Sequence, residues 1–263
     1  MPVTLQEILS STRESLPALR TRREALERDI RGSRVVRPSF RAALRRPAVA
    51  IIAEVKRRSP SAGWIRDDLD PGERAGLYAA HGAAAISVLT DGPYFGGSMR
   101  DLRAAAEHCP LALLRKDFIL DEVQILEARA AGASAVLLIV RVLGQSRLET
   151  LLRYTKELGL DALVEVHTPA ELAIALEANA GIIGVNSRDL DTFQIDTGVA
   201  WKLVSQIPSD RIAVAESGIV GQRDVARVAE VGADAVLVGT ALSAARSPET
   251  LLEELSSVMR HGR

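Results

Sequence analysis

The chain alternates short apolar runs with segments whose apolar residues have a helical spacing. The apolar runs are bounded on both sides by polar or turn-forming residues, a pattern typical of parallel strands that are buried on both faces. The repeating unit is roughly 20–35 residues long, which suits a closed parallel barrel of eight strand–helix units. We therefore predict an α/β fold with a (β/α)8 TIM barrel over residues 48–263. The eight strands are expected to begin near Val49, Ala84, Leu111, Ser134, Ala162, Gly181, Arg211 and Asp234.

The expected helices carry recognisable start and stop signals. Residues 70–73 (Asp-Pro-Gly-Glu) supply an N-cap, a proline in the first turn and a glutamate at the third position, and residues 168–171 repeat this arrangement. A Gly-Ala-x-Ala phrase recurs where helices should end, and its glycine can adopt the left-handed conformation there. The phrase begins at Gly82, Gly132 and Gly232. Weaker start signals are Asp121 with Gln124, Ser146 with Glu149, and residues 247–249.

Residues 1–47 do not follow this repeat. Residues 4–7 (Thr-Leu-Gln-Glu) form a capping box, and a ragged apolar stripe of helical spacing follows it. Pro17 is expected to divide this region into two helices. We predict an N-terminal helical extension over residues 1–47 that packs on the barrel, so that residues 1–263 form a single domain.

Composition argues against several classes of function. The 33 basic and 34 acidic side chains give a net charge of −1, so neither nucleic acid nor a membrane is expected as a partner. No apolar run approaches the ~18 residues of a membrane span, and the first residues lack the features of a signal peptide. Cys109 is the single cysteine, which indicates a reducing compartment. We expect a soluble, cytoplasmic monomer.

Ionisable and amide side chains stand where the predicted strands end. They are Glu54, Lys56, Lys116, Glu165, Asn186, Arg188 and Glu216. In a closed parallel barrel these strand ends meet at one face, and that face carries the chemistry. A lysine there can protonate a carbonyl oxygen or form a Schiff base, and a glutamate can act as a base. An amide beside a guanidinium suits a hydroxyl and a carboxylate or phosphate. The set as a whole suits proton transfer on an anionic substrate.

Three loops have features of a phosphate site. Residues 57–63 are basic and rich in hydroxyls, and they include Arg58 and Ser59. Loops after the last two strands, together with a helix N-terminus, are the recurrent phosphate site of this fold. Those loops contain Ser217, Gly218, Gly239 and Thr240. The predicted partner is therefore a small phosphorylated molecule.

The remaining candidates are weaker. We interpret His167 as a solvated loop residue, and Arg115 with Asp117 as a structural ion pair. No spacing of His, Cys, Asp and Glu suggests a metal, and no Gly-x-Gly-x-x-Gly follows the first strand, so neither metal nor cofactor is predicted. Apolar side chains near the strand ends could wall a pocket for an aromatic ring. They are Phe95, Phe118, Leu137 and Leu190.

Several motifs in this order make nearly the whole chain similar to the indole-3-glycerol phosphate synthase family. They cover residues 52–61, 86–91, 94–98, 114–119, 163–168, 183–190 and 215–219. The resemblance implies conversion of 1-(2-carboxyphenylamino)-1-deoxyribulose 5-phosphate into indole-3-glycerol phosphate, carbon dioxide and water, without a cofactor. It also implies that the N-terminal extension helps to close the pocket.

The resemblance further implies roles for the residues at the strand ends. Lys116 would be the general acid, and Glu165 the base that completes dehydration. Lys56 would hold the substrate carboxylate and assist proton transfer, while Glu54 and Glu216 would orient the lysines and the substrate hydroxyls. The remaining roles are implied as follows: Asn186 and Arg188 position the ribulose and the carboxylate, Arg58, Ser59, Ser217, Gly218, Gly239 and Thr240 hold the phosphate, and Phe95, Phe118, Leu137 and Leu190 enclose the ring.

The chain departs from the family pattern in two places. Thr240 stands where a serine or glutamate is expected, and Ser187 replaces a frequent asparagine. Two other readings stay open on the residues alone. One is a sugar-phosphate isomerase or aldolase that uses Lys116 as a Schiff-base lysine, and the other is a non-catalytic barrel that binds a phosphorylated ligand.

Overall fold

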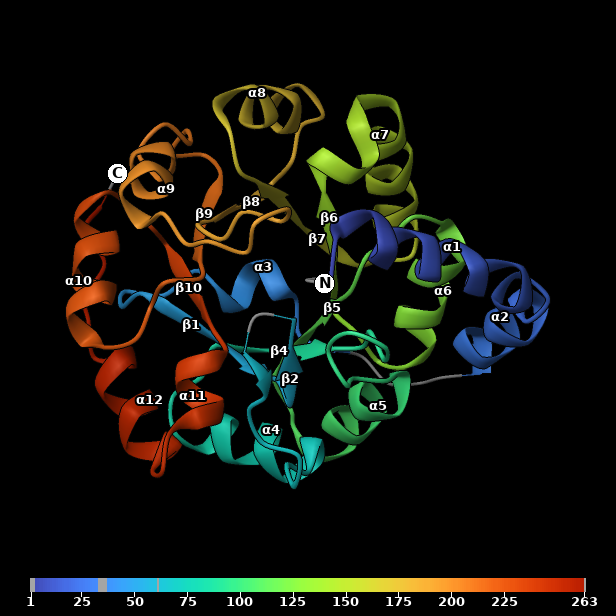
Figure 1. The fold of residues 1–263 in the computed structure, drawn as a ribbon, viewed down its shortest axis with the longest axis horizontal. Helices are drawn as coiled ribbons and strands as arrows, with labels where there is room; N and C mark the ends of the chain where they lie inside the picture. The colour runs from blue at the N-terminus through green and yellow to red at the C-terminus, as the bar shows by residue number, and fades with distance from the viewer. Residues whose placement is uncertain (1–2, 33–36, 61, 263) are drawn as a thin grey trace.

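Eight parallel strands form a closed barrel in a computed structural model that describes residues 3–32, 37–60 and 62–262 (Figure 1). Neighbouring strands follow the order β1-β10-β9-β8-β7-β6-β5-β4. Every barrel strand begins within one residue of its predicted start, which confirms the (β/α)8 fold. The strands are β1 (Ala50–Val55), β4 (Ala85–Leu89), β5 (Ala112–Lys116), β6 (Ala135–Ile139), β7 (Asp161–Val166), β8 (Ile182–Asn186), β9 (Ile212–Glu216) and β10 (Ala235–Val238).

Helices surround the barrel in Figure 1. They are α4 (Pro71–Ala80), α5 (Met99–His108), α6 (Glu122–Ala130), α7 (Val140–Glu157), α8 (Pro169–Glu177), α9 (Thr197–Val204), α10 (Gln222–Glu230), α11 (Thr240–Ala244) and α12 (Pro248–Ser256). The predicted N-caps Asp70, Asp121 and Thr168 each accept a backbone N–H with their side chains. The start predicted near Ser146 is confirmed to within two residues, because α7 consists of two helical stretches that are separated by a break at Gly144 (φ 63°, ψ 176°).

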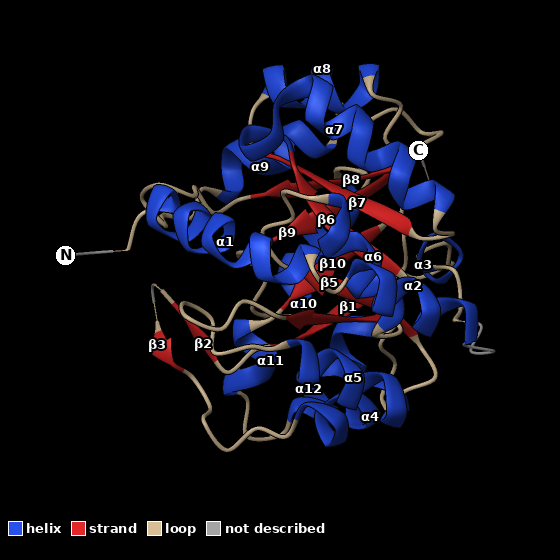
Figure 2. Ribbon diagram, turned by 90° about the vertical axis from the view of Figure 1, so that its right-hand side faces the viewer, coloured by secondary structure: helices blue, strands red, loops and turns tan. Residues whose placement is uncertain are grey.

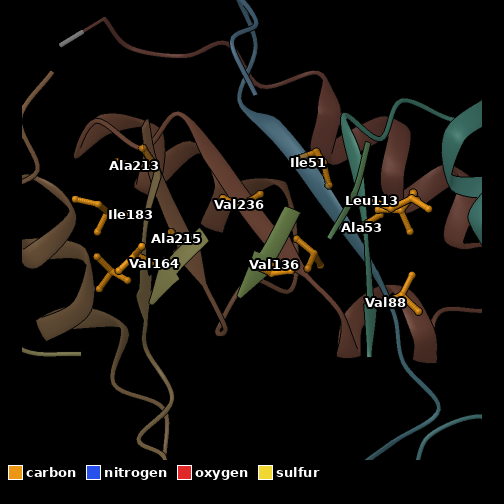
Figure 3. Packing of buried hydrophobic residues seen from close by; sticks show 14 of the residues in the cluster. Ile51, Ala53, Val88, Leu113, Val136, Val164, Ile183, Ala213, Ala215 and Val236 are labelled. Carbon is orange, nitrogen blue, oxygen red and sulfur yellow. The ribbon is translucent and has the colours of Figure 1, made fainter. Parts of the chain in front are cut away.

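Alternation along the strands divides the core into two layers. One set of side chains packs outward against the helices, as Figure 3 shows for residues such as Val136, Val164 and Val236. The other set fills the barrel interior and includes Leu114 and Leu163. Because successive side chains of a strand point to opposite faces, the inner row continues at every second residue toward the strand ends. This parity decides which polar residues enter the site.

Among the described residues before the barrel there are three helices, namely α1 (Leu5–Arg20), α2 (Arg23–Gly32) and α3 (Phe40–Ala43). The predicted break at Pro17 is wrong, since Pro17 lies within α1 and the helix ends at Arg20. A proline removes one N–H donor but keeps a helical φ, and packing compensates, because the adjacent Leu16 is buried against α6.

The two ends of the barrel are covered differently (Figure 2). Helix α1 and a short hairpin of β2 (Arg58–Ser59) and β3 (Gly63–Trp64), which the sequence did not predict, lie toward one end. Helix α3 lies toward the other end, where the fully buried Phe40 joins the interior cluster.

Candidate active site

The parity of the strands carries the predicted polar residues into the barrel. Glu165 follows the inward Leu163 by two residues in β7, and Glu216 follows the inward Val214 by two residues in β9. Lys116 continues the row of Leu114 in the same way. Each polar group therefore sits directly above the apolar interior.

One cavity at the carboxyl ends of the strands collects most of the predicted site. Thirteen of the seventeen residues predicted from the sequence line it. They are Glu54, Lys56, Ser59, Phe95, Lys116, Phe118, Leu137, Glu165, Asn186, Arg188, Leu190, Glu216 and Ser217. These thirteen residues come from seven of the eight barrel strands or the loops after them, and Leu237 of β10 lines the cavity as well, as expected for the catalytic face of this fold.

Lys116 lies at the centre of the charged groups. Its Nζ is 3.2 Å from Glu165 Oε2 and 3.5 Å from Glu216 Oε2, while its side chain is only 15% exposed. Burial alone would lower the pKa of Lys116, but the surrounding Glu165, Glu216 and Glu54 raise that pKa above its ordinary value. Lys116 is consequently a charged ammonium in the resting protein.

The two glutamates beside Lys116 differ in charge state. Burial opposes ionisation of Glu165, but Lys116 and His167 hold its pKa below the ordinary value. Burial raises the pKa of Glu216 to about 8, and the negative charges of Glu165 and Glu54 add to this effect. Near neutral pH the site therefore holds an ionised Glu165 and a protonated Glu216, which is the separation of roles that acid–base chemistry requires.

Two glycines make room for the carboxylates. A Cβ atom at Gly184 would overlap Glu216 Oε1 and would lie 3.1 Å from a methyl carbon of Leu163. A Cβ atom at Gly239 would overlap Glu54 Oε1 and would lie 3.1 Å from Lys56 Nζ. Glycine is thus required at both positions for the carboxylates to occupy the barrel mouth.

A second buried ion pair joins Glu54 and Lys56. Lys56 Nζ lies 3.0 Å from Glu54 Oε1, and Ser87 donates its hydroxyl to Glu54 Oε2 at 3.4 Å. The prediction that both side chains leave β1 toward the same face is confirmed by this contact. Lys56 is therefore held over the cavity by the carboxylate of Glu54, which the hydroxyl of Ser87 holds in turn.

An apolar wall faces the charged groups. The rings of Phe95 and Phe118 lie with centroids 6.3 Å apart. Asp91 fixes the loop that carries Phe95, since its Oδ1 accepts the backbone N–H of Phe95 at 3.1 Å. Leu5 and Ile8 of α1 also line the cavity, so the N-terminal extension forms part of its wall. The cavity thus has one side suited to a flat apolar ring and another suited to charge.

Comparison with known proteins agrees with this architecture. The sequence profile of a family described as indole-3-glycerol phosphate synthase matches residues 5–255. The chain belongs to the indole-3-glycerol phosphate synthase family. The resemblance drawn from the sequence motifs is confirmed.

Relatives in this family match most of the chain. An indole-3-glycerol phosphate synthase from Desulfosudis oleivorans is 45% identical over 256 residues, which cover 95% of this chain and 97% of that protein. The protein named indole-3-glycerol phosphate synthase 2 from Streptomyces coelicolor is 50% identical over 216 residues, 82% of this chain and 84% of its own. A solved structure of a thiamine phosphate pyrophosphorylase from Pyrococcus furiosus has a TM-score of 0.59 at 17% identity, over 82% of this chain and 96% of that chain, and is alike in fold.

Four predicted phosphate-binding residues of this family member do not line the cavity itself. Gly239, the N-cap of α11, lies against Glu54 and Lys56, and Thr240 is the first residue of that helix. Gly218 (φ 77°) packs against Thr197. Arg58 places its guanidinium 5.7 Å from the centroid of the Trp64 ring and donates to the Pro93 carbonyl at 3.3 Å. Ser59, which follows Arg58 in the sequence, and Ser217, which precedes Gly218, do line the cavity, while Ser61 lies outside the described residues.

The interpretation of His167 as a solvated loop residue is wrong. Its side chain is 4% exposed, and its Nε2 lies 3.5 Å from Glu165 Oε1 while its Nδ1 lies 3.3 Å from Glu171 Oε2. The cause is local, because Glu171 reaches back from the first turn of α8 and accepts the His167 backbone N–H at 2.7 Å. The capping motif at residues 168–171 was the available signal, since its glutamate is placed to fold back over the preceding residues.

Arg115 and Asp117 form the predicted ion pair at 3.0 Å. Across residues 3–32, 37–60 and 62–262, no helix is long and apolar enough to cross a membrane. Over the same ranges, no group of three or more His, Cys, Asp or Glu side chains is placed to hold a metal ion.

Proposed function

We propose that this chain catalyses the indole-3-glycerol phosphate synthase reaction, which closes the indole ring of 1-(2-carboxyphenylamino)-1-deoxyribulose 5-phosphate with loss of carbon dioxide and water. The observation that carries the proposal is the contact of a charged lysine, Lys116, with an ionised base, Glu165, at 3.2 Å in a cavity with an apolar wall. An acid and a base beside a slot for an aromatic ring are what ring closure and dehydration require.

Lys116 supplies the proton of the first step. The aromatic carbon that bears the carboxylate attacks the ribulose carbonyl carbon, the carbonyl π bond breaks, and its oxygen takes a proton from Lys116 Nζ. The raised pKa of Lys116 favours this role over Schiff-base formation, because an amine must be neutral to attack a carbonyl. Loss of carbon dioxide then returns the bonding electrons to the ring.

Glu165 serves the later step. It removes a proton from the former ribulose carbon 1, which is now the ring carbon next to nitrogen. Those C–H electrons form the ring double bond, the C–O bond of the hydroxyl made in the first step breaks, and the hydroxyl leaves as water with a proton from the ammonium of Lys56. Lys56, held by Glu54 at 3.0 Å, is placed to bind the substrate carboxylate and to assist this proton transfer. Glu216, protonated near neutral pH, is suited to donate a hydrogen bond to a substrate hydroxyl.

The remaining groups orient the substrate. Phe95, Phe118, Leu137 and Leu190 would enclose the ring, since all four line the cavity. Asn186 and Arg188 would position the ribulose and the carboxylate. Ser59 and Ser217, together with Arg58, Gly218, Gly239 and Thr240, would hold the phosphate, as hydroxyls and backbone N–H groups do at this end of the fold.

The proposal includes a cytoplasmic, monomeric enzyme that needs no cofactor and takes a small phosphorylated substrate as its only partner. Its lone cysteine, Cys109, is buried, in keeping with a reducing compartment. Light scattering across a range of concentrations tests the monomer, with a concentration-dependent rise in mass as the contrary result.

Purified protein mixed with the carboxyphenylamino substrate tests the reaction. We expect indole fluorescence to rise with time in the wild-type protein and to rise far more slowly with Lys116→Met. Addition of borohydride during turnover should trap no adduct on Lys116. A stable reduced adduct, together with no indole product, would favour the aldolase-like alternative.

A further inference from the structure

His167 is the buried titratable group that the mechanism above does not use. It lies two residues beyond Glu165, just after the last residue of β7, and its ring stands between the carboxylates of Glu165 and Glu171. Glu165 is therefore flanked by two cationic groups, since its Oε2 faces Lys116 and its Oε1 faces His167. The two facing atoms, Glu165 Oε1 and His167 Nε2, are buried 3.5 Å apart, and neither has a hydrogen-bond partner among the described residues.

The first step of the reaction changes the charge around Glu165. Once Lys116 has given a proton to the substrate oxygen, its amine is neutral, and Glu165 loses its main counter-charge. A carboxylate that is 1% exposed cannot be stabilised by solvent instead. Without a second cation, Glu165 would recover a proton from its surroundings and could not act as the base of the dehydration step.

We propose that His167 is a positioning residue whose imidazolium keeps Glu165 ionised and correctly oriented after Lys116 has donated its proton. This inference rests on the function proposed above. It assigns to the end of β7 a two-cation arrangement in which Lys116 acts on the substrate and His167 acts through Glu165 alone.

The groups around His167 favour its protonated form. Burial lowers the pKa of His167, but Glu171 on α8 and Glu165 on its own strand raise it above the ordinary value. Arg141 on α7 opposes this effect, although Arg141 Nε is itself paired with Glu171 Oε1 at 3.2 Å. The carboxylates of Glu165 and Glu171 thus outweigh burial and the charge of Arg141.

The pH profile of turnover separates this role from a structural one. In His167→Gln, we expect the acidic limb of the kcat profile to move to higher pH by about one unit, which is about a tenfold loss of kcat on the acidic side. KM should change by less than about twofold, and the variant and wild-type profiles should converge at high pH, where His167 of the wild type is neutral. Profiles that stay parallel at all pH values would overturn the proposal.

Two further variants test whether a shift of the acidic limb comes from the charge of His167 and not from the loss of any histidine. Glu171→Gln leaves the ring of His167 in place but removes the charge that holds its second nitrogen, so the acidic limb should move in the same direction by a smaller amount. His81→Gln is the matched control, because His81 also pairs with a glutamate, at 2.7 Å, but lies on the outside of the barrel between α4 and α12. Its profile should coincide with that of the wild type.

Chemical rescue and a direct titration complete the test. In His167→Ala, imidazole should restore kcat on the acidic side, whereas pyrazole, a ring of the same size but a much weaker base, should not. Carbon NMR of the Glu165 carboxyl should show that its pKa rises in His167→Gln, a readout that is independent of turnover. An unchanged Glu165 titration, or equal rescue by both rings, would contradict the inference, whereas a wild-type protein without activity would refute the proposed function instead.

Discussion

Replacement of the carboxyl group by an amide should change the stability of the protein in opposite directions at Glu165 and at Glu216, the two glutamates beside Lys116. Burial raises the pKa of Glu216 from 4.5 to about 8, whereas Lys116 and His167, working against burial, hold the pKa of Glu165 below 4.5. Glu216→Gln and Glu165→Gln are therefore a pair of equally conservative changes in one site. The free energy of unfolding as a function of pH distinguishes them.

The sign of each effect follows from proton binding. A carboxyl whose pKa is raised by folding binds more protons in the folded chain, so its contribution to stability is complete below pH 4.5 and is lost as the pH rises to about 8. The interval between 4.5 and 8 corresponds to about 5 kcal/mol as an upper bound, at about 1.4 kcal/mol per pH unit. Local relaxation reduces this value, so we expect Glu216→Gln to be about 2–4 kcal/mol more stable than the wild type at pH 9.

Glu165→Gln should show the reverse behaviour. A carboxyl whose pKa is lowered by folding contributes stability above its unfolded pKa of 4.5, and this contribution is lost as the pH falls through the lowered folded value. The variant should thus be less stable than the wild type at pH 7, and the difference between their free energies of unfolding should become smaller as the pH falls. This result would mean that Lys116 is paired chiefly with Glu165.

Urea unfolding followed by circular dichroism at several pH values between 4 and 9 gives the required differences. Glu230→Gln, on the exposed surface of α10, is the control and should track the wild type throughout. A stability difference for Glu216→Gln that does not change with pH, or the same sign for both site variants at pH 9, would refute the reasoning.

Further predictions concern catalysis and packing. Lys116→Ala should lower kcat by roughly 10²–10⁴-fold with an unchanged circular dichroism spectrum, the worth of a positioned proton donor, and near wild-type turnover would remove Lys116 from the mechanism. Gly184→Ala should destabilise the barrel by about 1–3 kcal/mol in urea unfolding and lower kcat, because its methyl group displaces Glu216. Ile8→Ala should raise KM more than it lowers kcat, since α1 contributes an apolar part of the cavity wall. A decrease in kcat as large as the increase in KM would contradict this role for Ile8. Activity should survive exhaustive chelation and dialysis, and rescue of a chelated sample by a divalent ion would contradict this.

The barrel was predictable because its strands are buried on both faces. Such strands appear in the sequence as uninterrupted apolar runs, and the flanking polar residues set each start to within one residue. The same parity that packs Leu163 inward also determines that Glu165 points into the cavity. The local pattern of apolar and polar residues therefore predicted both the barrel and the charged residues at the centre of the site.

Features that depend on distant contacts were not predictable in this way. Pro17 does not end α1, because the buried face against α6 outweighs the lost hydrogen bond. For His167 the capping motif at residues 168–171 was only an indirect signal, because the burial of the ring also depends on its contact with Glu171 and on the packing of α8 over β7. The contribution of Leu5 and Ile8 to the cavity likewise depends on how α1 lies across the barrel. To predict each of these features, one must know which helices and strands pack against each other, and the local sequence does not give this.

The proposed ring closure is tested most directly with substrate labelled at the carboxylate carbon. The account predicts that the wild-type protein releases one labelled carbon dioxide for each indole product formed, with the phosphate retained, and that Lys116→Met loses both products together. Release of carbon dioxide without indole, or formation of neither product by a folded wild-type protein, would contradict it.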